Sequence, residues 1–533
     1  MRLLAALAGI CMLLAGPLAA QTLDELVAKL PGGSFNDRAA VVGAIGATGD
    51  PRAAALLGAL QEGNLQQRKS DDAIVIVTGK GAAAKATDPL TGADLGDVEP
   101  RSTTPIKVNN ALRRSIRSAI ATLSLVDADP AKRLAAAEQA FAAPDPDAIA
   151  ALDTALDKEK DARVKASLGE ARAAAVLASV DAAPADKVAA VDLVAAHGGT
   201  DALKILAGLT TAPQADLAAA AKGAVAKIER EQAMWGAFQN VWYGLSLGSV
   251  LLLAAVGLAI TFGVMGVINM AHGELMMLGA YTTFVIQELI RAHAPGLFDY
   301  SLFIAVPAAF LVSGGVGVAI ERGIVRFLYG RPLETLLATW GVSLILQQAV
   351  RSLFGPNNRE VGTPSWMSGA FQIGEMQVTW NRFVIILFGL AVFVALLLLL
   401  KRSLFGLQMR AVTQNRPMAA EMGIRTPLID ALTFGLGAGI AGLAGVALSQ
   451  IDNVSPNLGQ AYIIDSFLVV VFGGAGNLWG TFAAAFSLGI ANKLLEPWAG
   501  AVLGKILILV FIILFIQKRP RGLFPQRGRA VEA

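Results

Sequence analysis

The stretch GLAITFGVMGVINMAHGELMMLGAY, residues 257–281, decides the fold. It includes the end of an uncharged run of 40 residues, 232–271. Such a run is too long for one membrane span of about 20 residues and too apolar for a solvated loop. Part of it therefore turns back at membrane depth. The segment 261–273, with three glycines and an Asn, predicts a broken helix there, buried in protein or lining a wet cavity.

The polar residues after this break have a role in the prediction. Asn269 is expected to N-cap a helix that begins at Met270, leaving free amide N–H groups and the positive end of a helix dipole. A carboxylate at Glu274, in the first turns, is favoured by that dipole. We predict that Asn269, His272 and Glu274 line a translocation path. In the alternative, Glu274 only caps the helix or pairs with a nearby loop arginine.

A second stretch of the sequence repeats the glycine-rich motif of the predicted break. FGVMG, residues 262–266, is matched by FGGAG, residues 472–476, and each ends one apolar segment and precedes another. Broken helices at matching places in an internal duplication point to the pathway of a transporter. Gly263, Gly266, Gly473 and Gly476 are therefore predicted path residues. Chance repetition of Gly-rich membrane packing is the alternative.

Composition places the chain in a membrane. Of its 533 residues, 55% are hydrophobic and 16% are charged, which is too apolar for a soluble protein of this length. The long apolar runs lie after residue 230, and the run 466–492 has GGAGN in its middle, so it is divided into two spans. The fold class is an all-α polytopic membrane protein of about nine membrane segments. The other apolar runs are 238–262, 275–287, 302–320, 335–350, 383–400, 431–451 and 506–517.

Positive charge predicts the sidedness. Three basic clusters follow the third, the fifth and the last span, and the positive-inside rule makes all three cytoplasmic. Counting back through nine spans puts residue 231 outside. The clusters are Arg322, Arg326 and Arg331; Lys401, Arg402, Arg410, Arg416 and Arg425; and Lys518, Arg519, Arg521, Arg527 and Arg529.

The N-terminus is predicted to direct export. MRLLAALAGICMLLAGPLAA, residues 1–20, has one Arg, an apolar core and small residues at its end, as a cleaved signal peptide has. An uncleaved first membrane helix is the alternative. The only cysteine, Cys11, lies in this stretch, so a mature chain would have no disulfide, thiolate metal site or cysteine nucleophile.

Residues 21–230 are predicted to form a periplasmic, mainly α-helical domain. Residues 49–64 resemble one HEAT-type helical repeat, and 144–175 and 197–209 look similar, each with a Gly or Pro break before an Ala/Leu helix. AIVIVTG, 73–79, and TPIKV, 104–108, predict two short strands inserted as a β-hairpin. The domain is either a docking module or a spacer.

The stretch around NMAHGELMMLGAY closely resembles the permease subunits of the branched-chain amino acid ABC importer family. LVVVFGGAGNLWGTFAAAFSLGI, 468–490, resembles the family's second Gly-rich segment, and the likeness covers roughly residues 236–524. A signal peptide with an exported extension resembles the urea permease branch. The resemblance implies a permease domain at 231–524, a cytoplasmic tail at 525–533 and a place in the bacterial inner membrane. It also implies a second permease subunit, two cytoplasmic ATPase subunits and a periplasmic solute-binding protein as partners.

FGLQMRAVTQNRPMAAEMGI, 405–424, looks like the cytoplasmic loop through which such permeases touch their ATPases. Residues 418–421 predict a short helix after Pro417, with Gly423 as its stop. A short amphipathic helix there could seat in a groove of a nucleotide-binding subunit. An ordinary basic loop is the alternative. The predicted coupling residues are Arg410, Asn415, Ala420, Glu421 and Gly423.

The absence of a nucleotide-binding motif from the sequence limits the classes of function that we expect. The sequence has no G-x-x-x-x-G-K-[ST] phosphate loop, because GAVLGK, 500–505, is one residue short. The chain is therefore expected to be a transport subunit and not an enzyme, with no cofactor, no metal and no nucleic-acid partner, and with ATP used by partner subunits. Urea is the first expected solute, and branched-chain amino acids are the second. An ion-coupled carrier with Glu274 as its proton or sodium site, and a signalling receptor, are the other classes.

Overall fold

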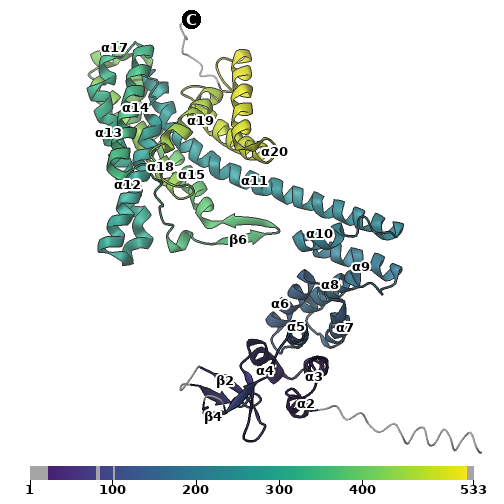
Figure 1. Cartoon of the computed structure of the whole chain (residues 1–533). Coiled ribbons are helices and arrows are strands. Elements are labelled where there is room, and N and C mark those ends of the chain that lie inside the picture. The colour runs from purple at the N-terminus through teal and green to yellow at the C-terminus, as the bar shows by residue number, and fades with distance from the viewer. Residues whose placement is uncertain (1–21, 80–83, 100–101, 525–533) are drawn as a thin grey trace, which may run out of the picture. The chain divides into compact units, whose positions relative to one another are not determined.

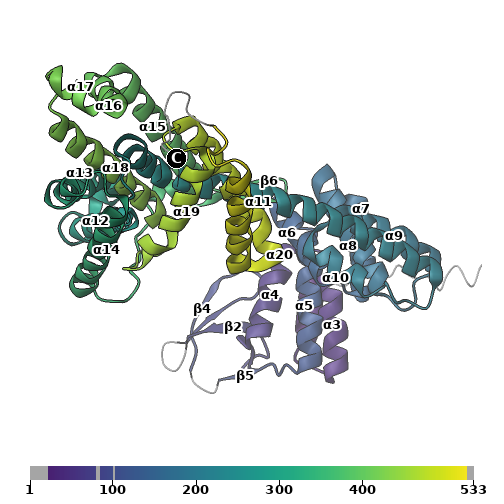
Figure 2. The same cartoon turned by 90° about the horizontal axis from the view of Figure 1, so that it is seen from above.

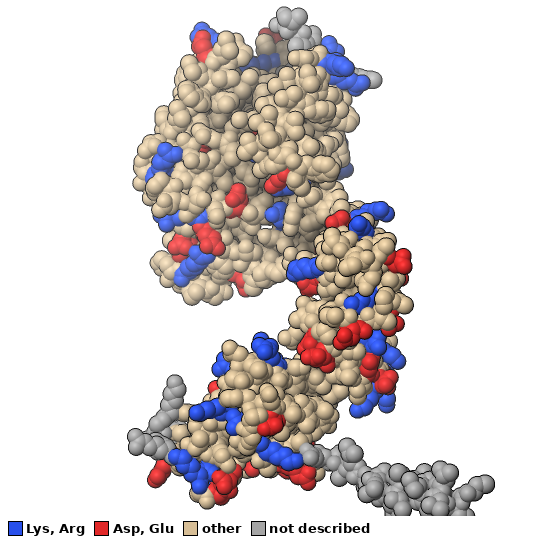
Figure 3. Space-filling view, turned by 45° about the vertical axis from the view of Figure 1, so that its right-hand side comes forward, with Lys and Arg blue, Asp and Glu red and all other residues tan. Residues whose placement is uncertain are grey.

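A computed structural model describes residues 22–79, 84–99 and 102–524. Two compact units divide the chain, Met1–Gln232 and Ala233–Ala533. The predicted signal peptide, 1–20, and the predicted cytoplasmic tail, 525–533, lie outside the described residues. On the face that Figure 3 shows, charged side chains are scattered over the first unit, whereas the second unit is mostly uncharged.

The first unit is built from short helices that bury Ala and Leu side chains. In the first half, α3 and α5 lie side by side (Figure 1), and Gly46 of α3 leaves no room for a Cβ against Ala119 of α5. The helices are α2 (Leu23–Lys29), α3 (Phe35–Ala47), α4 (Pro51–Glu62), α5 (Asn110–Ser124), α6 (Pro130–Ala142), α7 (Ile149–Lys158), α8 (Ala162–Ala178), α9 (Pro184–His197) and α10 (Gly199–Ala207), with a 3-10 turn η2 (Pro146–Ala148).

Helix ends in this unit follow the sequence signals. Asp50 caps α4, Pro51 occupies its first position, and Gly63 ends the helix at a φ of +78°. The helices expected in 49–64, 144–175 and 197–209 are therefore present. Their assignment to HEAT repeats stays a prediction.

Both predicted strands are present, as β2 and β5, but their predicted pairing with each other as one hairpin is wrong. Among the described residues the strands form a five-stranded antiparallel sheet in the order β4-β3-β2-β1-β5, and β1 lies between the two strands that were expected to pair. The sequence LQQR of β1 has no apolar alternation, and β4 reads DLGD, so neither carries a strand signal. The strands are β1 (Leu65–Arg68), β2 (Ile74–Thr78), β3 (Lys85–Thr87), β4 (Asp94–Asp97) and β5 (Thr103–Pro105).

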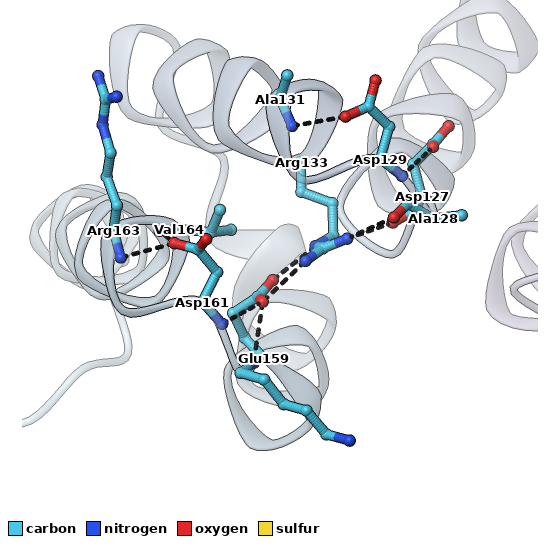
Figure 4. A network of polar contacts seen from close by, with 10 residues as sticks. Asp127, Ala128, Asp129, Ala131, Arg133, Glu159, Asp161, Arg163 and Val164 are labelled. Atoms are coloured by element: carbon cyan, nitrogen blue, oxygen red, sulfur yellow. Dashed lines mark hydrogen bonds and ion pairs between the residues drawn. The ribbon is translucent and has the colours of Figure 1, made fainter.

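An ion pair fixes the turn between α7 and α8 against the start of α6 (Figure 4). Arg133 donates two hydrogen bonds to Glu159, of 2.6 and 2.9 Å, and a third to the carbonyl oxygen of Asp127. Both side chains of the pair are largely buried. The hydrogen bonds from the Arg133 guanidinium lower the pKa of Glu159 to about 2.

The second unit is helical around a small-residue core. It contains the later part of α11 (Ala215–Met265), then α12 (His272–His293), α13 (Ser301–Gly323), α14 (Pro332–Phe354), α15 (Trp380–Arg402), α16 (Leu404–Gln414), α17 (Arg416–Glu421), α18 (Thr426–Ser449), α19 (Leu458–Gly473) and α20 (Leu478–Lys518). Three 3-10 turns, η3 (Pro295–Tyr300), η4 (Val325–Phe327) and η5 (Ser365–Met367), and a hairpin of β6 (Ala370–Ile373) and β7 (Met376–Thr379) complete it.

Every predicted apolar run falls on these helices, and the run 466–492 is divided between α19 and α20, as predicted. Among the described residues, five helices are long and apolar enough to cross a membrane, namely α11, α13, α15, α18 and α20. The predicted count of nine spans is therefore not confirmed. Helices α12 and α14 are of similar length to α13, but they carry more polar residues.

Glycines bring the central helices α12 and α18 into backbone contact. A Cβ on Gly279 would collide with the backbone of Gly442, and a Cβ on Gly445 would collide with the carbonyl oxygen of Met276. Small residues at such crossings are typical of membrane helix packing, where van der Waals contact drives association. Helix α18 is consequently buried along nearly its whole length, and α12 is held firmly against it.

Candidate functional site

The predicted break lies between α11 and α12. Helix α11 ends at Met265, Gly266 has a φ of +67°, and α12 begins at His272. The helix starts two residues later than predicted. The Asn269 side-chain oxygen accepts a hydrogen bond from the amide of Ala271 at 3.0 Å, which holds the turn that leads into the helix but does not cap it. The capping role assigned to Asn269 is therefore wrong in its position.

Asn269, His272 and Glu274 are all buried, with at most 1% of each exposed. A ring nitrogen of His272 bonds the carbonyl oxygen of Ala254 at 2.9 Å, so His272 ties α12 to α11. Glu274 lies in the first turn of α12, as predicted, and its carboxylate accepts a hydrogen bond from Ser343 of α14 at 3.2 Å. No ion pair with an arginine is formed by Glu274 within the described residues.

Helix α14 supplies residues that the sequence interpretation missed. Its buried face is polar, and its exposed face carries large apolar side chains such as Leu333, Leu337 and Trp340. This arrangement is the reverse of a soluble helix and suits a helix with one face on lipid or protein and the other on a polar interior. The signal was present as polar residues at four-residue spacing. The buried polar residues are Thr335, Thr339, Ser343 and Gln347.

The polar face of α14 contacts the break directly. The Thr339 hydroxyl accepts a hydrogen bond from the amide of Met270 at 3.1 Å, and Ser343 donates to Glu274 one turn further along. The unwound backbone of 266–271 is therefore satisfied in part by a neighbouring helix, as a break at membrane depth requires. We call Asn269, His272, Glu274, Thr339, Ser343 and Gln347 the polar cluster.

Several buried polar atoms in and near the polar cluster form no hydrogen bond within the described residues. Buried polar atoms normally have partners, because an unpaired one costs about 1–3 kcal/mol. Within residues 22–79, 84–99 and 102–524, several atoms on and beside this cluster form no hydrogen bond. They are Asn269 Nδ2, His272 Nδ1, Glu274 Oε2, Tyr281 OH and Gln347 Nε2. The polar cluster and its surroundings thus contain both donors and acceptors that form no hydrogen bond within the described residues.

The second predicted break is also present, between α19 and α20. Gly474 and Gly476 have φ angles of +102° and +82°, and Asn477 caps α20 by accepting hydrogen bonds from the amides of Trp479 and Gly480. A Cβ on Gly473 would meet the backbone of Gly480 at 2.5 Å. This break is therefore packed backbone against backbone.

The structure brings the two breaks together. A Cβ on Gly263 would lie 2.7 Å from the Cα of Gly476, so the two glycine-rich segments touch. Gly266 is exposed and has no neighbour within 4 Å of a Cβ position, so only its left-handed backbone requires glycine. Of the four glycines predicted to line a path, Gly263 and Gly476 meet, Gly473 packs on its own hairpin, and Gly266 stands apart.

The predicted short helix in the loop after α15 is confirmed. Helix α17 runs from Arg416 to Glu421, Asn415 caps it by accepting from the amide of Met418, and Gly423 follows at a φ of +85°. Ala420 and Glu421 are exposed. Arg410 differs from expectation, because its guanidinium donates to the carbonyl oxygen of Leu400 at the end of α15. This hydrogen bond fastens α16 to α15, although Leu404 and Leu407 of α16 are also exposed.

No group of three or more His, Cys, Asp or Glu residues able to hold a metal occurs in the described part of the chain. The titratable residues of the polar cluster are one acid and one histidine, and they bond to different helices. The polar cluster therefore offers hydrogen-bonding groups.

Comparison with known proteins identifies the family. Residues 240–516 match the family described as "Branched-chain amino acid transport system / permease component". The high-affinity branched-chain amino acid transport system permease protein BraD of Pseudomonas aeruginosa is 30% identical over 292 residues, which is 54% of this chain and 94% of that protein. The permease protein LivH of Escherichia coli K12 is 30% identical over 294 residues, again 54% and 94%.

A third relative, the permease protein LivM of Escherichia coli K12, is 23% identical over 307 residues, covering 52% of this chain and 69% of LivM. No solved structure matches the chain. The family match spans more than half of the sequence and includes both helix breaks, the polar cluster and α17. The chain therefore belongs to the permease component family of branched-chain amino acid transport systems.

Proposed function

We propose that this chain is the membrane permease subunit of an ABC importer and that its solute passes the polar cluster between α12 and α14. The observation that carries the proposal is the set of buried donors and acceptors beside a broken helix. Irregular backbone and buried polar groups at membrane depth are costly and persist where they line a path. Substrate sites of many transporters are formed by such discontinuous helices.

Urea is the solute that we propose. It is neutral, with two amide nitrogens that donate and one carbonyl oxygen that accepts. The polar cluster offers the carboxylate of Glu274 as acceptor and the amides of Asn269 and Gln347 as donors, and it holds no Lys or Arg that would neutralise a carboxylate solute. An extension ahead of the permease, resembling the urea permease branch, supports the same choice.

Branched-chain amino acids are the second candidate, and the relatives favour them, because BraD and LivH are both named for that transport. The ammonium group of an amino acid could pair with Glu274, and the apolar side chain could lie against α12. The two solutes differ in a way that uptake measures directly.

The coupling role of the loop is also part of the proposal. Ala420, Glu421 and the exposed side chains of Met418 and Met422 form the outer surface of α17 and of the turn after it. A cytoplasmic ATPase subunit is the proposed partner of this surface, and Asn415 and Gly423 set its ends. A second permease subunit, a second ATPase, a solute-binding protein and an inner-membrane location with the N-terminal unit exported complete the proposed assembly.

Uptake of labelled urea and labelled leucine, in cells with and without this chain, tests the solute. We expect urea uptake to depend on the chain; leucine uptake alone would overturn the choice of urea. Removing the ATPase subunits tests the class of transporter, because uptake that persists on an ion gradient would favour an ion-coupled carrier.

A further inference from the structure

The inner side of α17 is joined to the membrane helices by buried charge. Arg416, the first residue of α17, donates to the carboxylate of Asp430 on α18 at 2.5 Å. The Asp430 side chain is 2% exposed, whereas that of Arg416 is 42% exposed. Figure 2 shows α16 and α17 together at one end of the second unit.

A tyrosine extends this contact to a second membrane helix. The Arg416 guanidinium lies over the ring of Tyr329, 4.6 Å from its centroid, in a cation–π arrangement. The Tyr329 hydroxyl donates to the carboxylate of Glu321 near the end of α13, at 2.9 Å. Glu321 is 1% exposed, and its other oxygen lies 3.7 Å from Nε of Arg322.

Charge balance makes the contact hard to break. Within the described residues the buried carboxylate of Asp430 pairs with Arg416 alone, whereas Glu321 lies beside Arg322 and is connected to Arg416 through Tyr329. If α17 moved away alone, Asp430 would be left buried without its cation, and Tyr329 would lose the charge over its ring. Removing one partner of a buried pair is strongly unfavourable, so α17 and the ends of α13 and α18 are expected to move as one body.

Helix α18 in turn contacts α12, the helix that carries Glu274. Its glycines at 442 and 445 pack backbone against backbone on α12, at Gly279 and Met276. Such contacts leave little space for sliding, because packed glycine surfaces have no flexible side chain to yield. A displacement of α17 therefore has a rigid route through Asp430 and α18 to the helix that carries Glu274.

We propose that Arg416, Asp430, Tyr329 and Glu321 form a positioning lock that transmits movement of α17 to α18 and α13. The proposal rests on the proposed function, because it assumes that an ATPase subunit contacts the outer surface of α17. In that role these are positioning residues, since they act through helices and touch no solute. The lock determines how many solute molecules cross for each ATP hydrolysed.

The test uses the full complex in proteoliposomes and measures solute transported per ATP hydrolysed. Arg416→Met and Asp430→Asn are each expected to lower this ratio by about 2- to 30-fold, the range of coupling changes from single substitutions. The double variant should be no worse than the worse single variant, because the two residues act as a pair. Loss of folded complex alone lowers transport and hydrolysis together and leaves the ratio unchanged, so the ratio separates coupling from stability.

A matched control comes from the same side of the unit. Arg331 pairs with Glu334 at 3.2 Å, but both side chains are more than half exposed, so Arg331→Met should keep the ratio within about twofold, as loss of a surface pair does little. Wild-type ratios in assembled Arg416→Met and Asp430→Asn complexes would overturn the proposal.

If the Arg416 or Asp430 variant does not assemble, the Tyr329→Phe variant tests the proposed lock instead. It keeps the ring over Arg416 and removes only the hydroxyl that bonds Glu321. A lowered ratio supports the lock, and a wild-type ratio overturns it. Failure of the proposed function is recognised separately, since the wild-type complex itself would then show uptake without ATP hydrolysis.

Discussion

The two helix breaks of the second unit share a sequence motif but differ in the residues that surround them. Each has Phe-Gly-x-x-Gly and then an Asn, three residues after the last glycine in the first break and directly after it in the second. In each, the Asn side chain accepts a hydrogen bond from an amide of the next turn. After the first break come His272, which bonds to α11, and Glu274, which bonds to Ser343 on the polar face of α14. After the second come Trp479, which contacts the rings of Phe393 and Phe482, and Gly480, which packs on the backbone of Gly473. Glycines thus allow the helix to break, and the residues that follow determine whether polar side chains are buried beside the break.

The contact between the breaks gives the largest expected effect. Gly263→Val would force a branched side chain against the Gly476 backbone, and the cost should reach about 3 kcal/mol or more, since backbone yields less than a side chain. We expect little folded protein, measured as the yield of monodisperse protein in detergent. Gly341→Ala is the control, because a Cβ on Gly341 meets nothing within 4 Å. Equal yields for both variants would show that the breaks need not touch.

Glu274 should separate the two breaks by function. Glu274→Ala leaves the cluster without its acceptor, and transport should fall by about tenfold or more, as expected for buried groups left unpaired. Glu274→Gln keeps shape and one acceptor oxygen, so substantial urea transport should remain. Transport per assembled complex is measured. Wild-type transport by both variants would show that the Glu274 carboxylate is not part of the translocation path.

Asn269 and Asn477 offer a smaller contrast. Asn477→Ala removes a helix cap and should lower the free energy of unfolding by about 1 kcal/mol, with transport per folded complex unchanged. Asn269→Ala should lower transport more than stability, because Asn269 belongs to the polar cluster. Thermal unfolding and uptake are measured on both variants. The same pattern in both would erase the distinction between the breaks.

The smallest effect is expected in the first unit, where the Arg133–Glu159 pair stabilises the fold. The folded-state pKa of Glu159, about 2, lies below the value of about 4.3 for an unpaired Glu. Its stabilisation is therefore complete above about pH 5 and is lost as the pH falls towards 2. Limited proteolysis of this unit in the full chain should accelerate over that range. Glu159→Gln should be cleaved faster at neutral pH, with a weaker pH dependence below pH 5.

Sequence predicted the breaks well because glycines and uncharged length leave few alternatives at membrane depth. It placed the start of α12 two residues early, because Asn269 bonds the turn instead of the helix. It missed β1, whose polar residues gain their strand conformation from neighbours on both sides. It predicted an apolar span at 335–350 but missed the polar face of α14. The four-residue spacing of the Thr, Ser and Gln residues indicates one polar face, but it does not indicate that this face meets a carboxylate 69 residues away.

The Arg416–Asp430 contact could not be predicted from the sequence either. Basic residues in the loop were assigned to sidedness and to contact with a partner, which are properties of exposed charge. Only the fold places Arg416 over Tyr329 and against the buried Asp430. A charge that looks like part of a solvated loop is in fact half-inserted between helices.

Cysteine labelling compares the two breaks most directly. In a chain whose own Cys11 is replaced, Ser343→Cys places a thiol at the polar cluster, and Thr481→Cys places one at the second break, where Thr481 is fully buried. During ATP-driven turnover, a small polar thiol reagent should label the Ser343→Cys variant, excess urea should slow that labelling, and the Thr481→Cys variant should stay unlabelled. Labelling of the Ser343→Cys variant that is absent throughout turnover, or indifferent to both urea and leucine, would contradict a solute path at the first break.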